Sequence, residues 1–386
     1  MPLASLRPRE VLSREPASRP HICFVAPYAW PVRSRDPGIQ VVGGAEVQQC
    51  VIARLLAANG YRVSMISFDY GQPSPATVDG VTVYKSFRPD AGVPVLRFLH
   101  PRLSTMWRVL REVDADIYYQ RSATMWTGVV AGFCRRHGKR SIYAGASDRD
   151  FEVGKEQIAH ARDRWIFRRG LAQVDRIVAQ NPFQIESCRR NHGREAVLIP
   201  SCYQLPADRK AERGDGVLWV GTIHRYKRPH WLLDMAERLP HRRFVLVGGP
   251  SVDAEKCWPG YFDEMRRRAA SLPNVEFTGF LPLAAVEKQF DRARVLVLTS
   301  EYEGMPNVFL QAWARGIPTL GSVDVGAPVA TLYADVDEGA RKLEALLSDE
   351  VAWARRSAES LAYFERHHSS GEVLSRYAQL FQELTA

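Results

Sequence analysis

The residues whose spacing is most indicative of chemistry lie between Thr299 and Pro318. Glu303 stands in a short Gly-containing loop directly after an apolar run, and Gln311 follows eight positions later. Pro306 lies between them, and Pro favours the first position of a helix. We expect a strand, a loop that exposes Glu303, and a helix that carries Gln311 about one turn from its start. Both groups can then flank one ligand, and the helix start, with its free backbone N–H groups, suits a diphosphate.

A cationic loop is the second feature of this kind. Arg225, Lys227 and Arg228 follow an apolar run that ends at Gly221, and Thr222 comes directly after that glycine. Cations gathered after a strand can neutralise a nucleotide diphosphate. A solvated basic loop is an equally good interpretation when this window is taken alone.

Glycines follow several other apolar runs. Gly43 and Gly44 open a helical pattern, where a missing Cβ lets the backbone approach a phosphate or a sugar. Gly248 and Gly279 end two later runs and are weaker candidates, for contact with the diphosphate and the base respectively. A nicotinamide-nucleotide site would need G-x-G-x-x-G and an acid about 20 residues further on, and the chain has neither at the expected place.

Asp148 and Asp150 form a D-x-D pattern, which holds a divalent metal in some sugar-transferring enzymes. The pattern is short, and Asp335 and Asp337 repeat it in the same chain. We therefore expect no metal and no cofactor, and we take Asp148 as a candidate for the acceptor side of a site.

The elements that must position these residues alternate between short apolar runs and longer amphipathic ones. This alternation predicts a mainly parallel sheet covered on both faces, twice over. We expect an α/β fold with a disordered tail over residues 1–20, a first domain over 21–200, a linker over 201–216 and a second domain over 217–386. The last helix is a candidate to pack back on the first domain. Ligands of such folds bind at the carboxyl ends of the strands, here in the cleft between the domains.

Composition narrows the class of protein. The 386 residues are 46% hydrophobic and 25% charged, which excludes a disordered or collagen-like chain. The formal charge of +9 is uneven, because residues 21–200 carry +9 and residues 201–386 carry −2. The six cysteines have neither C-x-x-C spacing nor a zinc-ligand pattern, so we expect free thiols and a cytoplasmic enzyme.

The joint pattern of Glu303, the glycine loop and Gln311, with the cationic loop before it, resembles glycosyltransferase family 4, the glycosyl transferases of group 1. These are retaining, sugar-nucleotide-dependent enzymes of the GT-B fold, which consists of two facing Rossmann-like domains. The resemblance runs from about residue 21 to the end of the chain and is strongest from Val217 to Ser322.

The resemblance implies a role for each matching position. Glu303 corresponds to the acid at the reacting face of the donor sugar, and Lys227 to a cation at the diphosphate. The loop after Glu303 corresponds to a segment whose backbone binds sugar and phosphate; it comprises Gly304, Met305, Pro306, Asn307 and Val308. Gln311 replaces a second glutamate that holds the ribose hydroxyls, and Thr222 replaces an arginine, so Arg225 and Arg228 become candidates for the missing cation. Asp148 stands near the place of a family histidine.

The resemblance implies a hexosyltransferase that uses a UDP-sugar or GDP-mannose type of donor, in polysaccharide or glycoconjugate biosynthesis. Basic and bulky apolar residues alternate over 94–113 and 161–176, which suits either a peripheral contact with an anionic membrane or an ordinary amphipathic helix. The basic first half favours a glycan or an anionic lipid-linked acceptor. Nucleic acid is not expected, since no binding motif accompanies the charge. A GT-B sugar-nucleotide epimerase and a non-catalytic nucleotide-sugar-binding protein are the alternatives.

Overall fold

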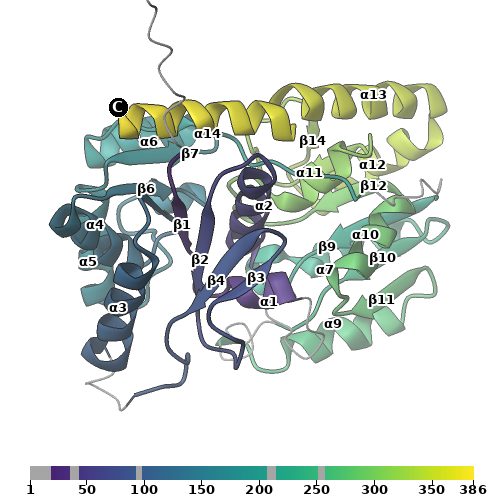
Figure 1. Cartoon of the computed structure of the whole chain (residues 1–386). Coiled ribbons are helices and arrows are strands. Elements are labelled where there is room, and N and C mark those ends of the chain that lie inside the picture. Colours follow the sequence, from purple (N-terminus) through teal and green to yellow (C-terminus); the bar gives the residue numbers. More distant parts are fainter. Residues whose placement is uncertain (1–18, 35–42, 93–97, 207–213, 251–256) are drawn as a thin grey trace, which may run out of the picture.

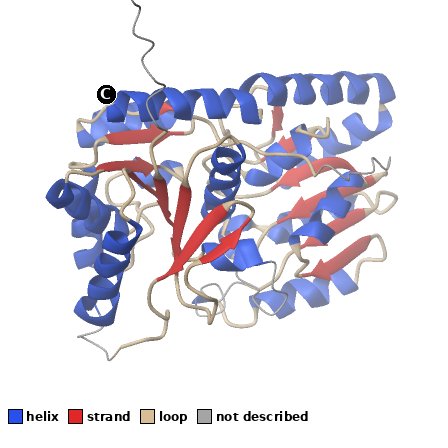
Figure 2. Cartoon of the chain, in the orientation of Figure 1, coloured by secondary structure: helices blue, strands red, loops and turns tan. Residues whose placement is uncertain are grey.

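The computed structural model describes residues 19–34, 43–92, 98–206, 214–250 and 257–386. Two β-sheets lie side by side, and helices pack on both faces of each (Figure 1). Figure 2 shows the same alternation of strands and helices along both halves. The predicted pair of doubly wound α/β domains is confirmed. Most of the expected tail, residues 207–213 of the expected linker and Arg97 of the basic window lie outside the described residues.

The first sheet has the strand order β3-β4-β2-β1-β5-β6-β7-β8. Its strands are β1 (Ile22–Val25), β2 (Val63–Ser67), β3 (Ala76–Val78), β4 (Val81–Lys85), β5 (Ile117–Arg121), β6 (Arg140–Ala144), β7 (Arg176–Ala179) and β8 (Val197–Leu198). Every pairing is parallel except that of β3 with β4. All residues of β1, β2 and β5 are buried, as expected for central strands of a sheet covered on both faces.

Two groups of helices cover this sheet. They are α1 (Ala29–Ser34), α2 (Gly44–Ala58), α3 (Ser104–Val113), α4 (Trp126–His137), α5 (Ala161–Leu171) and α6 (Pro182–His192), with the short turns η2 (Leu99–Leu103) and η3 (Asp148–Phe151). One core lies between the sheet and α2, and a second lies between the sheet, α3 and α4. The ends of α6 follow from local chemistry: Asn181 caps its start before Pro182, and Gly193 ends it in a left-handed conformation.

The second sheet is wholly parallel, with the order β11-β10-β9-β12-β13-β14. Its strands are β9 (Gly216–Val220), β10 (Phe244–Val247), β11 (Val275–Gly279), β12 (Ala293–Leu298), β13 (Thr319–Gly321) and β14 (Ala330–Leu332). The helices are α7 (Pro229–Arg238), α9 (Tyr261–Ala270), α10 (Leu283–Asp291), α11 (Asn307–Trp313), α12 (Val336–Ser348), α13 (Glu350–His367) and α14 (Ser370–Thr385). Because β9 and β12 are central neighbours, the loops that follow them meet at one edge of the sheet.

The last two helices return the chain to the first domain. Figure 1 shows α13 along the second domain and α14 continuing over the first. Val373, Tyr377 and Phe381 of α14 are buried in the core that also holds β1 and α2. The hydroxyl groups of Tyr119 and Tyr377 lie 3.1 Å apart. The two domains are therefore joined by this helical crossing as well as by the linker.

The edge strands β3 and β14 were not predicted from the sequence. β3 and β4 form a hairpin through Asp79 and Gly80, both with positive φ. Asp-Gly between two short apolar runs is a strong hairpin signal, and it could have identified β3. β14 has three residues and only one neighbouring strand, so the sequence gives it little periodicity.

Candidate active site

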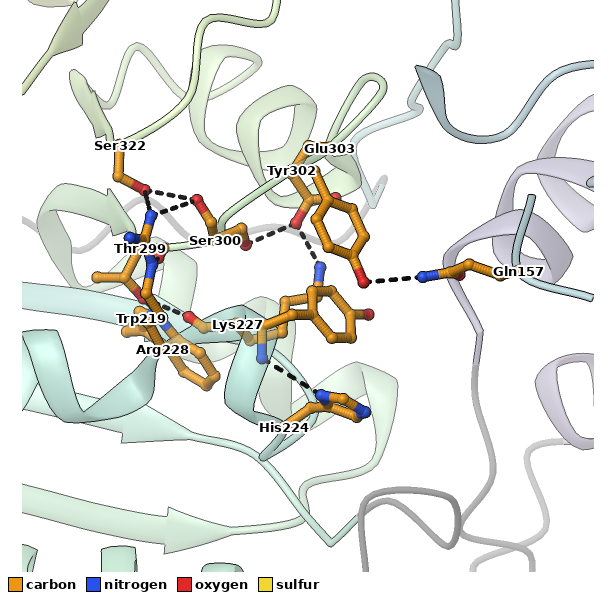
Figure 3. A network of polar contacts seen from close by, with 11 residues as sticks. Gln157, Trp219, His224, Lys227, Arg228, Thr299, Ser300, Tyr302, Glu303 and Ser322 are labelled. Atoms are coloured by element: carbon orange, nitrogen blue, oxygen red, sulfur yellow. Dashed lines mark hydrogen bonds and ion pairs between the residues drawn. The ribbon is translucent and has the colours of Figure 1, made fainter. Parts of the chain in front are cut away.

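The acid and the cation predicted from separate loops lie together in the structure. The ammonium of Lys227, at the end of η4 (Arg225–Lys227), donates to Oε1 of Glu303, and the Ser300 hydroxyl donates to the same oxygen at 2.7 Å (Figure 3). Their side chains remain 20% and 14% exposed, so both are partly open to a ligand. Burial alone would lower the pKa of Lys227, but the Glu303 carboxylate outweighs that effect and the pKa is raised. The contact with Glu303 therefore favours the charged form of Lys227.

Arg228 fixes the loop that carries Glu303. This residue has φ of +46°, and its guanidinium donates to the Thr299 carbonyl at 2.7 Å and to the Ser300 carbonyl at 2.9 Å. It also donates to Ser322 at 3.3 Å and stacks 3.8 Å from the Trp231 ring centroid. Arg228 thereby joins its own loop to the backbone before Glu303, and its role at the diphosphate stays a prediction.

Arg225 is left as the second candidate cation. Arg225 is exposed, and its guanidinium lies 5.7 Å from the ring centroid of Trp258 and 5.4 Å from that of Tyr261. Thr222 is exposed on the same loop. Arg225 shares the η4 turn with Lys227, but none of the contacts of the described residues joins it to Glu303.

The glycine loop of the first domain reaches the start of α11. Asn307 Nδ2 donates to the Gly44 carbonyl at 2.9 Å, and Gln48 donates to Asn307 Oδ1 at 2.9 Å. Gly43 caps the start of α2 next to this contact. Pro306 is the cap residue before the helix, whereas the sequence predicted it at the first helical position. α11 has only 7 residues, so its backbone dipole is a weaker anion-binding feature than the charge of Lys227.

The loop after Glu303 lies against the first domain. A Cβ on Gly304 would come within 2.8 Å of the Ala146 carbonyl oxygen and 3.1 Å of Gln184 Nε2. Met305 and Val308 pack into the core between the second sheet and α11. Their side chains therefore help to hold the loop in place, and contact between the loop backbone and a ligand stays a prediction.

Asp148 faces this loop from the first domain. Its Oδ1 accepts hydrogen bonds from Asn181 Nδ2 at 3.1 Å and from Gln184 Nε2 at 2.9 Å. Burial raises the pKa of the Asp148 carboxyl, and Glu303 and Glu152 add to the effect. The two amide groups thus hold the Asp148 side chain in place opposite the Glu303 loop.

Asp150 has a different role although it completes the D-x-D pattern. Its carboxylate accepts from the backbone N–H groups of Ala146 at 2.7 Å and Ser147 at 3.2 Å, which caps η3. Among the residues that the structure describes, no three His, Cys, Asp or Glu side chains are grouped as they would be around a metal ion.

Gly248 allows two strands to pack closely, and Gly279 allows the chain to turn at the end of a strand. A Cβ on Gly248 would lie 2.0 Å from the Gly221 carbonyl oxygen, so β9 and β10 can approach only with glycine there. Gly279 has φ of +68° at the end of β11. Both lie at the carboxyl edge of the second sheet, but neither contacts the charged pair.

Two features of the site have no clear signal in the sequence. Gln311 donates from Nε2 to Oε1 of Glu287 on α10 at 3.0 Å, and both residues are buried. Tyr302 stacks on Tyr226 with ring centroids 4.8 Å apart, while its hydroxyl accepts from Gln157 of the first domain at 2.8 Å (Figure 3). Each contact joins segments far apart in the sequence, so only the fold reveals it.

Two family models match the chain. The model described as Glycosyltransferase Family 4 matches residues 42–204, and the one described as Glycosyl transferases group 1 matches residues 214–349. Together they extend over both domains and the whole candidate site. The chain belongs to glycosyltransferase family 4. The family resemblance drawn from the Glu303 window is confirmed.

Curated relatives carry specific names. The D-inositol 3-phosphate glycosyltransferase of Mycolicibacterium paratuberculosis is 31% identical over 204 residues, which are 47% of this chain and 45% of the relative. The mannosylfructose-phosphate synthase of Agrobacterium fabrum is 26% identical over 203 residues, 46% of this chain and 43% of the relative. The matched segment thus spans a little under half the length of either curated relative.

Solved structures confirm the GT-B fold for this family 4 chain. A sucrose-phosphate synthase from Thermosynechococcus elongatus has a TM-score of 0.74 at 18% identity and covers 95% of this chain and 99% of its own. HepE from Anabaena, in complex with UDP and glucose, has a TM-score of 0.70 at 16% identity with the same coverage.

Proposed function

We propose that the chain is a retaining glycosyltransferase that moves a sugar from a nucleotide diphosphate donor to a hydroxyl group, without a metal ion. The observation that carries the proposal is the Lys227–Glu303 pair, which lies where the loop after Glu303 meets Asp148 of the first domain. Family 4 membership and the UDP complex of HepE support a UDP-sugar or GDP-mannose type of donor.

Each charged group then has a role in the transfer. The bond between the anomeric carbon and the diphosphate oxygen breaks, and Lys227, aided by Arg225, stabilises the charge on the leaving diphosphate. Glu303 orients the donor sugar and stabilises its cationic face. The acceptor hydroxyl forms the new bond on the same face, and its proton passes to the leaving phosphate oxygen, as the family resemblance implies. Asp148 accepts a hydrogen bond from the acceptor and so orients it.

An anionic acceptor fits the charge of the first domain. Arg149 lies beside Asp148, and its guanidinium has no ion pair with a described residue; it lies 4.2 Å from the Tyr302 ring centroid. Two relatives are named for phosphorylated compounds, D-inositol 3-phosphate and mannosylfructose-phosphate. We therefore favour a phosphorylated polyol, glycan or lipid-linked sugar, within polysaccharide or glycoconjugate biosynthesis.

The proposed place of action is the cytoplasm, with a peripheral contact at an anionic membrane. Trp165 of α5 is 63% exposed and Leu99 of η2 is 59% exposed, and Arg162 lies 3.8 Å from the ring centroid of the neighbouring Phe98. Exposed apolar and basic groups together suit a membrane surface. None of the described helices combines the length and apolar character required to cross a bilayer. Cosedimentation with anionic but not neutral vesicles would support the contact. Failure to sediment with either kind of vesicle would contradict it.

Thermal stabilisation by nucleotides tests the donor site. UDP, GDP, ADP and TDP and their common sugar conjugates are added with and without a chelator. A ligand at about 100 times its dissociation constant stabilises the folded state by about 2.7 kcal/mol. Stabilisation by one nucleotide family that persists with chelator supports the proposal. Stabilisation by none of them contradicts it.

A further inference from the structure

Gln311 lies among charged side chains that would disfavour a glutamate at this position. Glu287 of α10 accepts from Gln311 Nε2 on Oε1, and from the Tyr203 hydroxyl and Arg315 on Oε2, both at 2.6 Å. Arg315 also donates to Asp291 at 2.8 Å. One guanidinium is thus shared by two carboxylates, so a third carboxylate at position 311 would face like charge at about 3 Å.

Gln311 is neutral and supplies what this arrangement needs. Its side-chain N–H group donates to Glu287. Its own Oε1 accepts no hydrogen bond from a described residue, and this oxygen is not fully buried. Oε1 of Glu287 accepts one hydrogen bond and can accept a second. Two neighbouring acceptor oxygens, one of them charged, are therefore available from α10 and α11.

These oxygens lie about one helical turn from the contact between the domains. Gln311 follows Asn307 by four residues, so it lies on the same face of α11, about 6 Å further along the axis. Asn307 touches Gly44 and Gln48 of the first domain, and Tyr203 comes from the linker. Glu303 and Gln311 stand on the loop and the helix that follow the same strand, β12, so one extended ligand can contact both.

We propose that Glu287 carries the carboxylate of the donor's ribose site in this chain, and that Glu287 Oε1 and Gln311 Oε1 accept hydrogen bonds from the cis-diol of the ribose. A vicinal diol offers two adjacent O–H donors, which matches two adjacent acceptors better than a phosphate does. The inference rests on the proposed function and makes Glu287 a specificity-determining residue for ribonucleotides.

The test measures dissociation constants by calorimetry for UDP, GDP and ADP and for their 2′-deoxy counterparts. The parent protein is expected to bind the ribonucleotide about tenfold more tightly, the effect of one hydrogen bond to a charged acceptor. Glu287→Gln should reduce this preference to about threefold or less. Gln311→Glu should weaken binding of the ribonucleotide, and the double variant Glu287→Ala/Gln311→Glu should regain the preference, because one carboxylate then remains.

Asp291→Asn is the matched control. It removes a carboxylate from the same Arg315 without touching Gln311, so it is expected to lower the melting temperature and to leave the ribose preference unchanged. An unchanged preference in Glu287→Gln, or a double variant that binds no better than Gln311→Glu, would overturn the inference while the donor site stands. Failure of the parent protein to bind any nucleoside diphosphate would overturn the proposed function as well.

Discussion

Tyr302 is expected to hold the two domains together at the site. Its ring stacks on Tyr226 of its own domain, the Arg149 guanidinium lies 4.2 Å from its centroid, and Gln157 donates to its hydroxyl at 2.8 Å. The last two contacts cross between the domains, so Tyr302→Ala removes both. Tyr302→Phe removes only the hydrogen bond.

The contacts set the size of the effect. A partly exposed cation–π contact contributes about 1 kcal/mol and a hydrogen bond about 1 kcal/mol. Tyr302→Ala therefore costs about 2 kcal/mol of the free energy that favours the joined arrangement, a shift of about 30-fold in its population. Tyr302→Phe costs about 1 kcal/mol, or about fivefold. Gln157→Ala removes the same hydrogen bond from the other side and should match Tyr302→Phe.

The assay compares kcat/KM for the acceptor with the radius of gyration measured by small-angle scattering in saturating nucleotide. We expect kcat/KM to fall in the order parent, Tyr302→Phe, Tyr302→Ala, while the radius of gyration rises in the same order. Parent-like kcat/KM in Tyr302→Ala, or a Gln157→Ala variant that differs clearly from Tyr302→Phe, would refute the reasoning.

Three further predictions concern charge. Glu303→Gln should lower kcat by about 100-fold with little change in donor affinity, whereas Lys227→Ala should raise the donor's dissociation constant as well; equal, negligible effects in a kinetic assay would contradict both roles. Asp148→Asn should lower kcat without weakening nucleotide binding, and because burial raises the pKa of Asp148, parent activity should begin to fall with acidification above the range of an ordinary aspartate. Burial lowers the pKa of His368 from 6.5 to about 4, so folding stability present above pH 6.5 should decline by about 3 kcal/mol as the pH falls to 4. Denaturant unfolding should show this loss in the parent and a smaller one in His368→Asn, and identical pH profiles would exclude it.

The sequence predicted most of the fold because each central strand is a short apolar run followed by an amphipathic one. β1 is wholly apolar and buried on both faces, whereas β2 and β5 are buried although each contains two polar residues. The strands with few neighbours were harder to predict: β14 has three residues and one partner, and β3 depends on the turn through Asp79.

The candidate site was predictable where its residues follow neighbouring strands of one sheet. The Glu303 loop and the Lys227 loop follow neighbouring strands, so their residues meet. The role of Arg228 depends on its positive φ, which turns the guanidinium back onto the Thr299 and Ser300 carbonyls. The neutrality of Gln311 has a physical explanation only once Glu287 is seen beside it.

Release of nucleoside diphosphate during turnover tests the central claim most directly. The parent protein and Glu303→Gln are incubated with UDP-, GDP-, ADP- and TDP-sugars, with and without phosphorylated polyol and lipid-linked acceptors. We expect one donor to release its diphosphate only when an acceptor is present, in the presence of chelator, with the α-linked sugar retained in the product and the rate reduced about 100-fold in Glu303→Gln. Diphosphate release that needs no acceptor, or that is equal in the parent and in Glu303→Gln, would contradict the account.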